Sequence, residues 1–587
     1  MSNKATFKER LLYLFNEKRG QDAYSERMKR EQTQEQKPEK TGKRTSTPRM
    51  AASGYGNRGA SQTLSSMIGW IVNGGSAEDD IDVHGALLRK RARDLYAGGG
   101  LARSGPNTLS TNVVGWGIRP KPKVDADLLG LTDEQRDEWE RNTLREFKLW
   151  AENPMCDAER QQNFYGLQQL TFLSMLMSGD VFVLFGMKEN KRTPYQTTIR
   201  ILEADRVATP DSNGDSTAQA SETAGNRIID GVEIDKEGAV VKYYIASHHP
   251  LMESSDDELT YTPIDAYGKD TGYPLILHVM THERPEQRRG VPFVAANIET
   301  LKQFDRYMNA ELAANVVSAM LAIFIETDSD DGTLGLEDAV NEDERVTNDD
   351  IQLELAPGAV YSLPPGKKVK EVNPVRNNSA FKDFVATMET IIGSSMDIPK
   401  EVLIKKYESN YTAARGALLD FWRTVRVHRT RFNNMFNQPV YEQWLSEAVA
   451  TGRIEAPGFF DDPAIRQAWC GCMWMGVSMG HVDPLKEVNA AAQRILLNIS
   501  TEEQEAAEYN GNDWNENIPQ RKKELNALAD AATAQPNNGD GGDGDEDENK
   551  DNSGSKAEAL ERYKIVRDII RACAKLEEQE EIERDGE

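Results

Sequence analysis

The chain has 587 residues with a formal net charge of −26, and 38% of its residues are hydrophobic. Because domains usually hold about 100 to 200 residues, this length predicts more than one packed core. A membrane helix needs ~20 uncharged apolar residues, and the best candidate run, residues 170–185, contains Asp180. We therefore expect no membrane span and no membrane partner. Four cysteines are too few for a disulfide framework, and the charged start lacks the apolar core of a secretory signal, which predicts maturation in a reducing cytoplasm.

The charge is unevenly distributed along the chain. Residues 1–60 carry 14 Lys and Arg side chains against 7 Asp and Glu side chains, and large apolar residues are few after Phe15. This composition predicts a flexible basic arm. The remainder is strongly acidic, and tight DNA binding needs many Lys and Arg contacts on one face. We therefore expect any DNA contact to be local and weak.

Residues 61–290 predict a mixed α+β region. The spacing of apolar residues indicates helices over 81–96, 132–150 and 164–177, and Thr132 with Gln135 suits a capping box at the start of the second. Gly179 and Asp180 end the third helix. Short runs rich in β-branched and aromatic residues then predict strands over 181–185, 198–202, 240–245 and 275–279.

The clearest predicted helix covers residues 293–321, directly after the helix-start signal Gly290-Val291-Pro292. It contains no Gly or Pro, and at ~1.5 Å per residue it would be a rod of roughly 43 Å. Such a helix is too long for ordinary core packing. Its apolar side chains recur at near-helical spacing, namely Val294, Ile298, Leu301, Met308, Leu312, Val316 and Met320.

An acidic insert follows this helix. Between Ala322 and Glu371 there are 13 Asp and Glu side chains but only 4 Lys and Arg side chains. Two short β-like pieces, around 351–355 and 359–363, predict a small exposed module. A second helix over 379–396 returns from the insert, and the Asp397-Ile398-Pro399 sequence ends it.

The next segment, 400–410, reads as a short, locally basic loop before a long amphipathic helix over 411–436. Four arginines of that helix lie within about 120° of one another at ~100° per residue. They form either a functional basic face or only the solvated side of a core helix. Further helices are predicted over 484–497 and 501–533, followed by a Gly/Asp/Asn-rich linker and a charged helix. The four arginines are Arg415, Arg423, Arg426 and Arg429.

Signatures of catalysis are missing from the sequence. No Gly-Lys pair belongs to a phosphate-binding loop, and no H-E-x-x-H motif occurs. Cys470-Gly471-Cys472 lacks a second thiol pair for a zinc site. The letters around Ser478 match a hydrolase nucleophile elbow, but the order of acid and histidine fails. We expect no enzyme activity, no cofactor and no metal site.

Seven blocks of the sequence form a recognisable series: 112–118 (NVVGWGI), 289–293 (RGVPF), 299–307 (ETLKQFDRY), 310–312 (AEL), 357–361 (PGAVY), 411–415 (YTAAR) with Trp422, and 482–487 (VDPLKE). Together these segments resemble the portal proteins of tailed bacteriophages, lambda family. The likeness extends in the family's order from about residue 60 to 530, and the block from Gly290 to Leu312 is the most specific. The basic start and the residues after 536 depart from it.

The resemblance implies a ring, usually a homododecamer, at one capsid vertex of the virion. Double-stranded DNA would be packaged and ejected through its central channel. The terminase large subunit would dock on it first, and head-completion or adaptor proteins of the head-tail connector would follow. Major capsid and scaffold proteins are further implied partners, because such a ring would nucleate procapsid assembly in the host cytoplasm.

Carried over to this sequence, the family's fold is α+β and mainly helical, with wing, stem, clip and crown regions. The resemblance does not cover the two ends. The expected division is a flexible basic arm 1–60, wing 61–290, first stem helix 291–321, clip 322–372, second stem helix 373–397, tunnel loop 398–410, long helix and wing 411–450, crown 451–535, disordered acidic linker 536–556 and charged C-terminal helix 557–587.

Two sets of candidate site residues follow. Lys400, Lys405, Lys406 and Asn410 of the tunnel loop would touch the DNA, although these lysines could also merely solvate a turn. Asp328, Asp330 and Asp331 of the clip would form the docking surface for the motor and adaptor. Two other functions stay open: a different structural head protein, adaptor-like or scaffold-related and without a DNA channel, and a nucleic-acid enzyme, against which the missing nucleotide loop speaks.

Overall fold

The computed structural model describes residues 74–210, 219–252, 258–320, 323–325, 360–362, 379–407, 411–479, 484–510 and 514–533. The chain divides into two units, 1–74 and 75–587, and the described residues other than Gly74 belong to the second. The arm, the linker, the C-terminal helix and most of the clip lie outside the described residues. The expected α+β, mainly helical fold is confirmed.

The first helices agree with the sequence pattern. A short π-helical turn, η2 (Glu78–Asp82), leads into α3 (Val83–Gly98), and Gly99, with φ of 88°, separates α3 from α4 (Gly100–Val113). The predicted capping box is present, because Thr132 and Gln135 exchange side-chain hydrogen bonds at the start of α6 (Asp133–Ala151). The remaining elements here are β1 (Arg119–Pro122), α5 (Ala126–Leu129), η3 (Pro154–Cys156) and α7 (Phe164–Ser178).

Two antiparallel sheets follow. The first has the order β3-β2-β9, and its register places Val183 opposite both Ile201 and Leu277. The second has the order β4-β5-β6-β7-β8. All four predicted strands form. The bounds are β2 (Asp180–Met187), β3 (Thr197–Glu203), η4 (Ala204–Arg206), β4 (Gln219–Ala220), β5 (Arg227–Ile229), β6 (Val232–Ile234), β7 (Val240–Ala246), β8 (Tyr261–Asp265) and β9 (Ile276–Met280).

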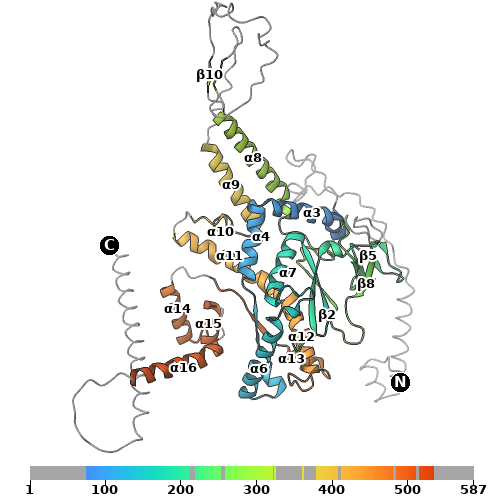
Figure 1. Cartoon of the computed structure of the whole chain (residues 1–587), viewed down its shortest axis with the longest axis vertical. Helices are drawn as coiled ribbons and strands as arrows, with labels where there is room; N and C mark the ends of the chain where they lie inside the picture. The colour runs from blue at the N-terminus through green and yellow to red at the C-terminus, as the bar shows by residue number, and fades with distance from the viewer. Residues whose placement is uncertain are drawn as a thin grey trace, which may run out of the picture. The chain divides into compact units, whose positions relative to one another are not determined.

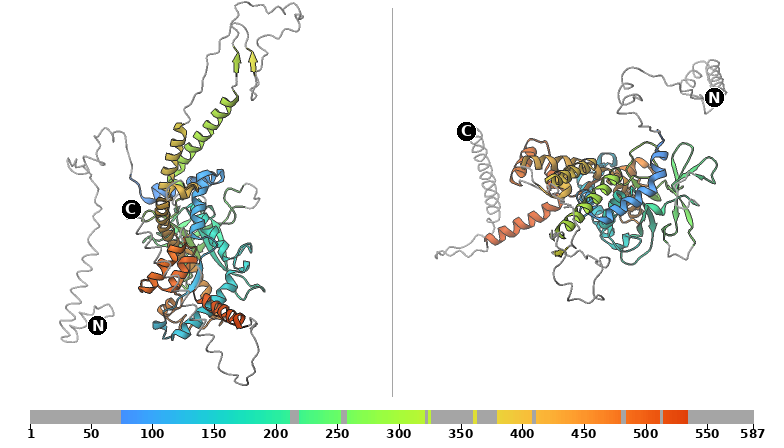
Figure 2. Two further views of the ribbon diagram at one scale, coloured as in Figure 1. Left: turned by 90° about the vertical axis from the view of Figure 1, so that its left-hand side faces the viewer. Right: turned by 90° about the horizontal axis from the view of Figure 1, so that it is seen from above.

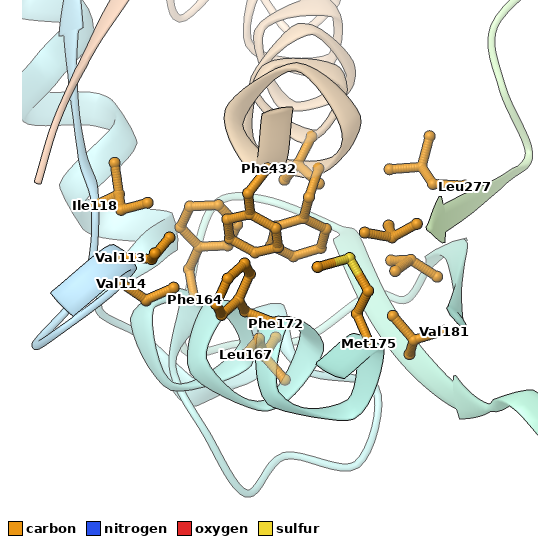
Figure 3. Packing of buried hydrophobic residues seen from close by; sticks show 14 of the residues in the cluster. Val113, Val114, Ile118, Phe164, Leu167, Phe172, Met175, Val181, Leu277 and Phe432 are labelled. Atoms are coloured by element: carbon orange, nitrogen blue, oxygen red, sulfur yellow. The ribbon is translucent and has the colours of Figure 1, made fainter. Parts of the chain in front are cut away.

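Aromatic side chains dominate the larger hydrophobic core. Figure 3 shows Phe164 and Phe172 of α7 meeting Phe432 from the end of α11 (Tyr411–Phe432). The ring centroids of Phe172 and Phe432 are 5.2 Å apart, and those of Phe147 and Trp444 are 4.9 Å apart with an edge-on geometry. Such pairs add to the burial of apolar area. Segments far apart in the sequence, α6, α7 and the residues after 430, are therefore joined in one core.

The long helix α8 (Ile298–Met320) and the returning α9 (Ser379–Ser395) lie side by side (Figure 1, Figure 2). The ring of Tyr307 contacts those of Phe381 and Phe384, at centroid distances of 5.9 and 4.6 Å. The predicted start at residue 293 is wrong. The amide of Phe293 donates to the carbonyl of Leu176, and a short 3-10 turn, η5 (Ala295–Asn297), precedes α8. The rod is therefore about 35 Å long at ~1.5 Å per residue.

Six described residues of the expected clip form two strands that pair in parallel, β10 (Ile323–Ile325) and β11 (Val360–Ser362). The helix extends beyond the range 411–436 that its apolar spacing predicts, because α11 continues through a π-helical turn, η7 (Asn433–Asn437), into α12 (Gln438–Ala450). None of the helices in the described ranges combines the length and hydropathy of a membrane span. The last elements are α13 (Pro463–Trp469), β12 (Cys472–Met475), α14 (Pro484–Leu496), α15 (Glu502–Asn510) and α16 (Trp514–Thr533).

Candidate functional site

A buried arginine organises the junction between the two sheets and the start of α8. Arg289 is fully buried, and its Nε donates to Asp180 Oδ2 at 2.6 Å. Its other nitrogens donate to the carbonyls of Ala204, Val207 and Asp230 at 2.7 to 2.9 Å. The guanidinium thus connects β2, η4 and the β5–β6 turn. A buried charge of this kind needs nearly complete pairing.

Asp180 receives three donors and is fully buried. Besides Arg289, the amide of Gly290 and His278 Nε2 lie within 3.0 Å of its Oδ2. Burial by itself raises the pKa of a carboxyl, but the charge of Arg289 and the hydrogen bond with His278 hold the pKa of Asp180 well below its usual range. The carboxylate therefore stays ionised and fixes the backbone that leads into α8.

Two glycines allow this backbone to approach the sheet. A Cβ on Gly290 would lie 2.0 Å from the carbonyl oxygen of Gly179. A Cβ on Gly179, whose φ is 93°, would lie 2.5 Å from the carbonyl carbon of Gly290. Only glycine fits such a contact between two backbones. The start of β2 and the segment before α8 are thus held in direct contact.

A second set of charges ties α3 to the same junction. Arg89 Nε donates to Asp205 Oδ1 at 2.8 Å, and Arg89 Nη1 lies 3.3 Å from Asp230 Oδ2. The amide of Arg289 donates to Asp82 Oδ1 at 3.1 Å. Burial, helped by repulsion from Asp230, raises the pKa of Asp82 to about 6 despite this hydrogen bond. The junction therefore contains one carboxyl that titrates far above its ordinary range.

The α8–α9 pair carries apolar side chains that the single chain leaves exposed. Leu301, near the start of α8, is buried, but Leu312 further along is 64% exposed. On α9, Phe384 and Ile391 are 42% and 52% exposed. A run of large apolar side chains on one helix pair marks a surface for association.

The segment predicted as a tunnel loop begins as a helix. Residues Lys400–Ile404 form α10, in which Val402 and Leu403 are buried, and the Ser104 hydroxyl donates to the Leu403 carbonyl at 2.7 Å. The loop expectation is wrong for this half of the segment, because its two apolar residues pack against the body. Lys405 ends the helix with φ of 58°, and Lys405 and Lys406 are exposed.

A groove of about 1060 Å³ lies between α11 and the hairpin of α14 and α15. The α11 side is cationic, and on the α14–α15 side four glutamates outnumber Lys486 and Arg494. Arg415 Nη2 lies 4.0 Å from Glu487 Oε1. Arg426 Nη2 lies 3.8 Å from Glu508 Oε1. We call the cationic side, Lys121, Lys123, Arg415, Arg426 and Arg429, the basic wall.

Arg429 has a structural role within this wall. Its Nε donates to the Val113 carbonyl at 2.9 Å, and its Nη2 donates to the carbonyls of Asn112 and Val477 at 2.8 and 2.7 Å. Burial, together with the nearby charge of Arg426, lowers the pKa of Arg429 to about 10. Positive charge is therefore crowded at this end of the groove.

The comparison with known families decides the identity. The family description "Phage portal protein, lambda family" matches residues 63–429, which is more than half of the chain. The chain belongs to the lambda family of phage portal proteins. The family assignment and the non-enzymatic, structural role expected from the sequence are confirmed, and a portal protein is part of the virion. In the part of the chain that the structure describes, no cluster of His, Cys, Asp and Glu could hold a metal ion.

Named portal proteins show how far the likeness extends. Portal protein B of Escherichia phage lambda is 24% identical over 453 residues, covering 74% of this chain and 82% of the relative. The portal protein of Escherichia phage N15 is 24% identical over 476 residues, covering 78% and 87%. The probable portal protein of Halomonas phage phiHAP-1 is 25% identical over 429 residues, covering 71% and 76%. The lambda-family likeness thus reaches beyond the residues that the family description matches.

Solved structures also resemble the chain. One is a chain from the virion of a native gene transfer agent particle, at 13% identity and a TM-score of 0.33, covering 66% of this chain and 93% of that one. Another is from the neck of the native particle computed with C12 symmetry, at 14% identity and a TM-score of 0.35, with the same coverage.

The structure of this lambda-family chain places only part of the predicted site. Lys400 lies at the start of α10, with its Nζ 3.6 Å from Glu389 Oε2, whereas Lys405 and Lys406 lie beyond its end. The structure therefore does not gather the three lysines at one point. Asn410 and the clip aspartates Asp328, Asp330 and Asp331 lie outside the described residues.

Sequence reasoning missed two sets of residues. Arg289 was part of a segment that carried the family resemblance, but its role as the centre of a buried network was not predicted. An arginine directly before a glycine at the entry to a long helix was the available signal. The acidic partners of the α11 arginines were also missed. The run of glutamates at 502–508 could have indicated them.

Proposed function

We propose that this lambda-family portal protein forms a closed ring, of twelve subunits by the family's usual number, around a channel at one capsid vertex. Double-stranded DNA enters through the channel during packaging and leaves through it at ejection. In this proposal 61–290 form most of the wing, α8 and α9 the stem, 322–372 the clip and 451–535 the crown. The segment 398–410 lies at the channel wall.

The observation that carries the proposal is the exposed apolar surface of the α8–α9 pair. The side chains of Leu312, Phe384 and Ile391 would face water on an isolated chain, at a cost that burial removes. A ring solves this, because each pair packs against the pairs of its two neighbours. Two antiparallel helices from each subunit then surround a central hole.

The DNA path follows from charge. An acidic channel wall at the clip and stem repels phosphate, so DNA slides along these parts of the channel without sites that trap it. Lys405 and Lys406, which are exposed after the end of α10, supply brief local contacts with the phosphate backbone of the DNA. Lys400 lies near Glu389, with its Nζ 3.6 Å from Glu389 Oε2.

The partners bind at the outer end of the stem. The terminase large subunit docks on the clip, where Asp328, Asp330 and Asp331 attract it, and head-completion or adaptor proteins later replace it. Charge complementarity of this kind mainly accelerates docking and makes it sensitive to salt. Major capsid and scaffold proteins assemble around the ring, which nucleates the procapsid in the host cytoplasm.

The test is assembly of the variant Leu312→Asp. Because Leu312 is exposed in the single chain, the variant should fold normally, with an unchanged circular dichroism spectrum. It should fail to form rings, since a carboxylate would be buried without a partner at the subunit contact. Sedimentation velocity and negative-stain images measure both points.

The matched control is Asn309→Asp, which adds the same charge at an exposed polar position of α8 and should leave rings intact. Wild-type chains that stay monomeric, or rings without a central hole, would contradict the proposal and favour an adaptor-like or scaffold-related head protein. Normal rings and normal DNA packaging in Leu312→Asp would show that the stem does not form the contact between subunits.

A further inference from the structure

Ion pairs link the C-terminal helices to the body. Of the side chains described between residues 484 and 533, none is buried. Three ion pairs cross the groove: Glu487 with Arg415, Glu508 with Arg426, and Glu503 with Lys121. Arg426 and Glu508 are 61% and 54% exposed, so water and salt reach this pair.

The glutamates act from one unit. Within the hairpin, Arg494 of α14 donates to both carboxylate oxygens of Glu505 on α15, at 2.8 and 2.5 Å. This bidentate pair fixes the two helices to each other. Glu487, Glu503 and Glu508 therefore meet the basic wall together. We call these three carboxylates the acidic cover.

We propose that the basic wall of α11 and β1 is a binding surface for the phosphate backbone of double-stranded DNA, and that the acidic cover occupies it until DNA displaces it. Each carboxylate of the cover lies within 4.0 Å of a cation that would otherwise pair with a phosphate group. Lys121, Arg415 and Arg426 supply the cations on the body side, and Arg429 is held in place by three backbone carbonyls.

The competition has a physical basis on both sides. The cover is tethered to the wall through one chain, so its effective concentration there is high and dilute polyanions do not displace it. Duplex DNA presents many phosphates at close spacing and releases counterions when cations bind it. Because the two ligands exclude each other, DNA binding must release α14 and α15 as strongly as the cover weakens DNA binding. The choice of DNA as the polyanion rests on the proposed function.

The experiment measures duplex affinity of the full chain with and without the cover's charge. The variant Glu503→Gln/Glu508→Gln should bind a fluorescent duplex of about 20 base pairs roughly tenfold tighter than wild type at roughly 50 mM salt. Adding Arg426→Gln to this variant should remove most of the gain. The matched control is Glu502→Gln, which neutralises an exposed residue of the same helix outside the groove and should change affinity less than about twofold.

A second readout follows the cover itself. Amide hydrogen exchange of α14 and α15 should accelerate several-fold in the double variant, and in wild type on addition of the duplex, while α7 stays protected. Unchanged duplex affinity in the double variant, an equal gain in Glu502→Gln, or unchanged exchange of α15 with bound duplex would each overturn the inference. Electron microscopy of the same samples distinguishes this inference from the proposed function. If wild type forms rings but these effects are absent, only the inference about the acidic cover is wrong. If wild type forms no rings, only the proposal of a ring is wrong.

Discussion

Ion pairs do different work in the body of the chain and at its C-terminal helices. In the body, the Arg289 and Asp180 side chains are both fully buried, and their atoms meet at 2.6 Å. At the groove, Arg426 and Glu508 are more than half exposed and lie 3.8 Å apart. The side chains of the first pair are excluded from water, so neither of them can pair with solvent or ions instead. The second pair competes with solvent and ions at all times.

This difference separates a rigid region from a releasable one. Removing one partner of a buried pair leaves an uncompensated charge, which costs about 3–5 kcal/mol. An exposed pair contributes about 0–1 kcal/mol and is screened by salt. The aromatic core adds rigidity around α6, α7 and the segment after α11, whereas the described residues from 484 onward add no buried side chain. The buried pair thus fixes the backbone that leads into α8, and the C-terminal hairpin can move without unfolding the body.

The largest effect should come from Arg289→Met. The substitution keeps the volume but leaves Asp180 buried without its main counter-charge, so unfolding free energy should fall by about 3–5 kcal/mol. Urea denaturation followed by tryptophan fluorescence measures it. Arg423→Met is the control, because Arg423 is 82% exposed and its loss should change stability by less than about 0.5 kcal/mol.

A double variant sharpens this test. Asp180→Asn combined with Arg289→Met removes both charges, and part of the lost stability should return. Equal urea midpoints for Arg289→Met and Arg423→Met would mean that the buried pair does not stabilise the junction. The body and the C-terminal helices would then not differ in how their ion pairs contribute to stability.

The pH dependence of stability tests the same junction with a smaller effect. The folded-state pKa of Asp82, about 6, lies above its ordinary value of 3.8. The protonated form is thus favoured by folding, and its contribution is fully present below pH 4 and is lost as the pH rises through 6. Relative to Asp82→Asn, wild type should lose about 2 kcal/mol across this window.

Other carboxyls have lowered pKa values and affect stability in the opposite direction as the pH changes. Wild type must therefore be compared with Asp82→Asn at each pH. The pKa of Asp180 and that of Asp205 are lowered by their arginines against the effect of burial, and their contribution disappears as the pH falls. Urea midpoints of wild type and Asp82→Asn at pH 4, 5, 6 and 7 give the difference. Parallel curves would show that Asp82 is not the titrating group.

Sequence reasoning succeeded where the signal was local. The capping box of Thr132 and Gln135, the break at Gly179 and the four strands β2, β3, β7 and β9 depend on residues within one element, and each was predicted. The short strands β4, β5, β6 and β8 were not predicted. The start of α8 was not, because Phe293 is held by the carbonyl of Leu176, which lies in another helix. The helix α10 was missed for the same reason, since Val402 and Leu403 gain their burial from distant elements.

The candidate site was harder to predict for a related reason. A chain with 96 acidic residues offers too many partners for any one arginine. The sequence could show that Arg415 and Arg426 share a helical face, but it could not show that Glu487 and Glu508 cover that face. Tertiary contacts decide which charge is buried, and burial decides what a charge contributes.

The smallest expected effect concerns salt at the groove. Raising the salt from roughly 0.1 M to 1 M shortens the Debye length from about 10 Å to about 3 Å. The exposed Arg426–Glu508 pair of the cover, worth about 0–1 kcal/mol, should weaken, and amide exchange in α14 and α15 should rise several-fold. Exchange in α7 should stay unchanged, because its contacts with Phe432 and Phe436 are apolar. If both regions responded equally, the hairpin would be attached by the same forces as the body. If neither did, the ion pairs of the groove would not hold it.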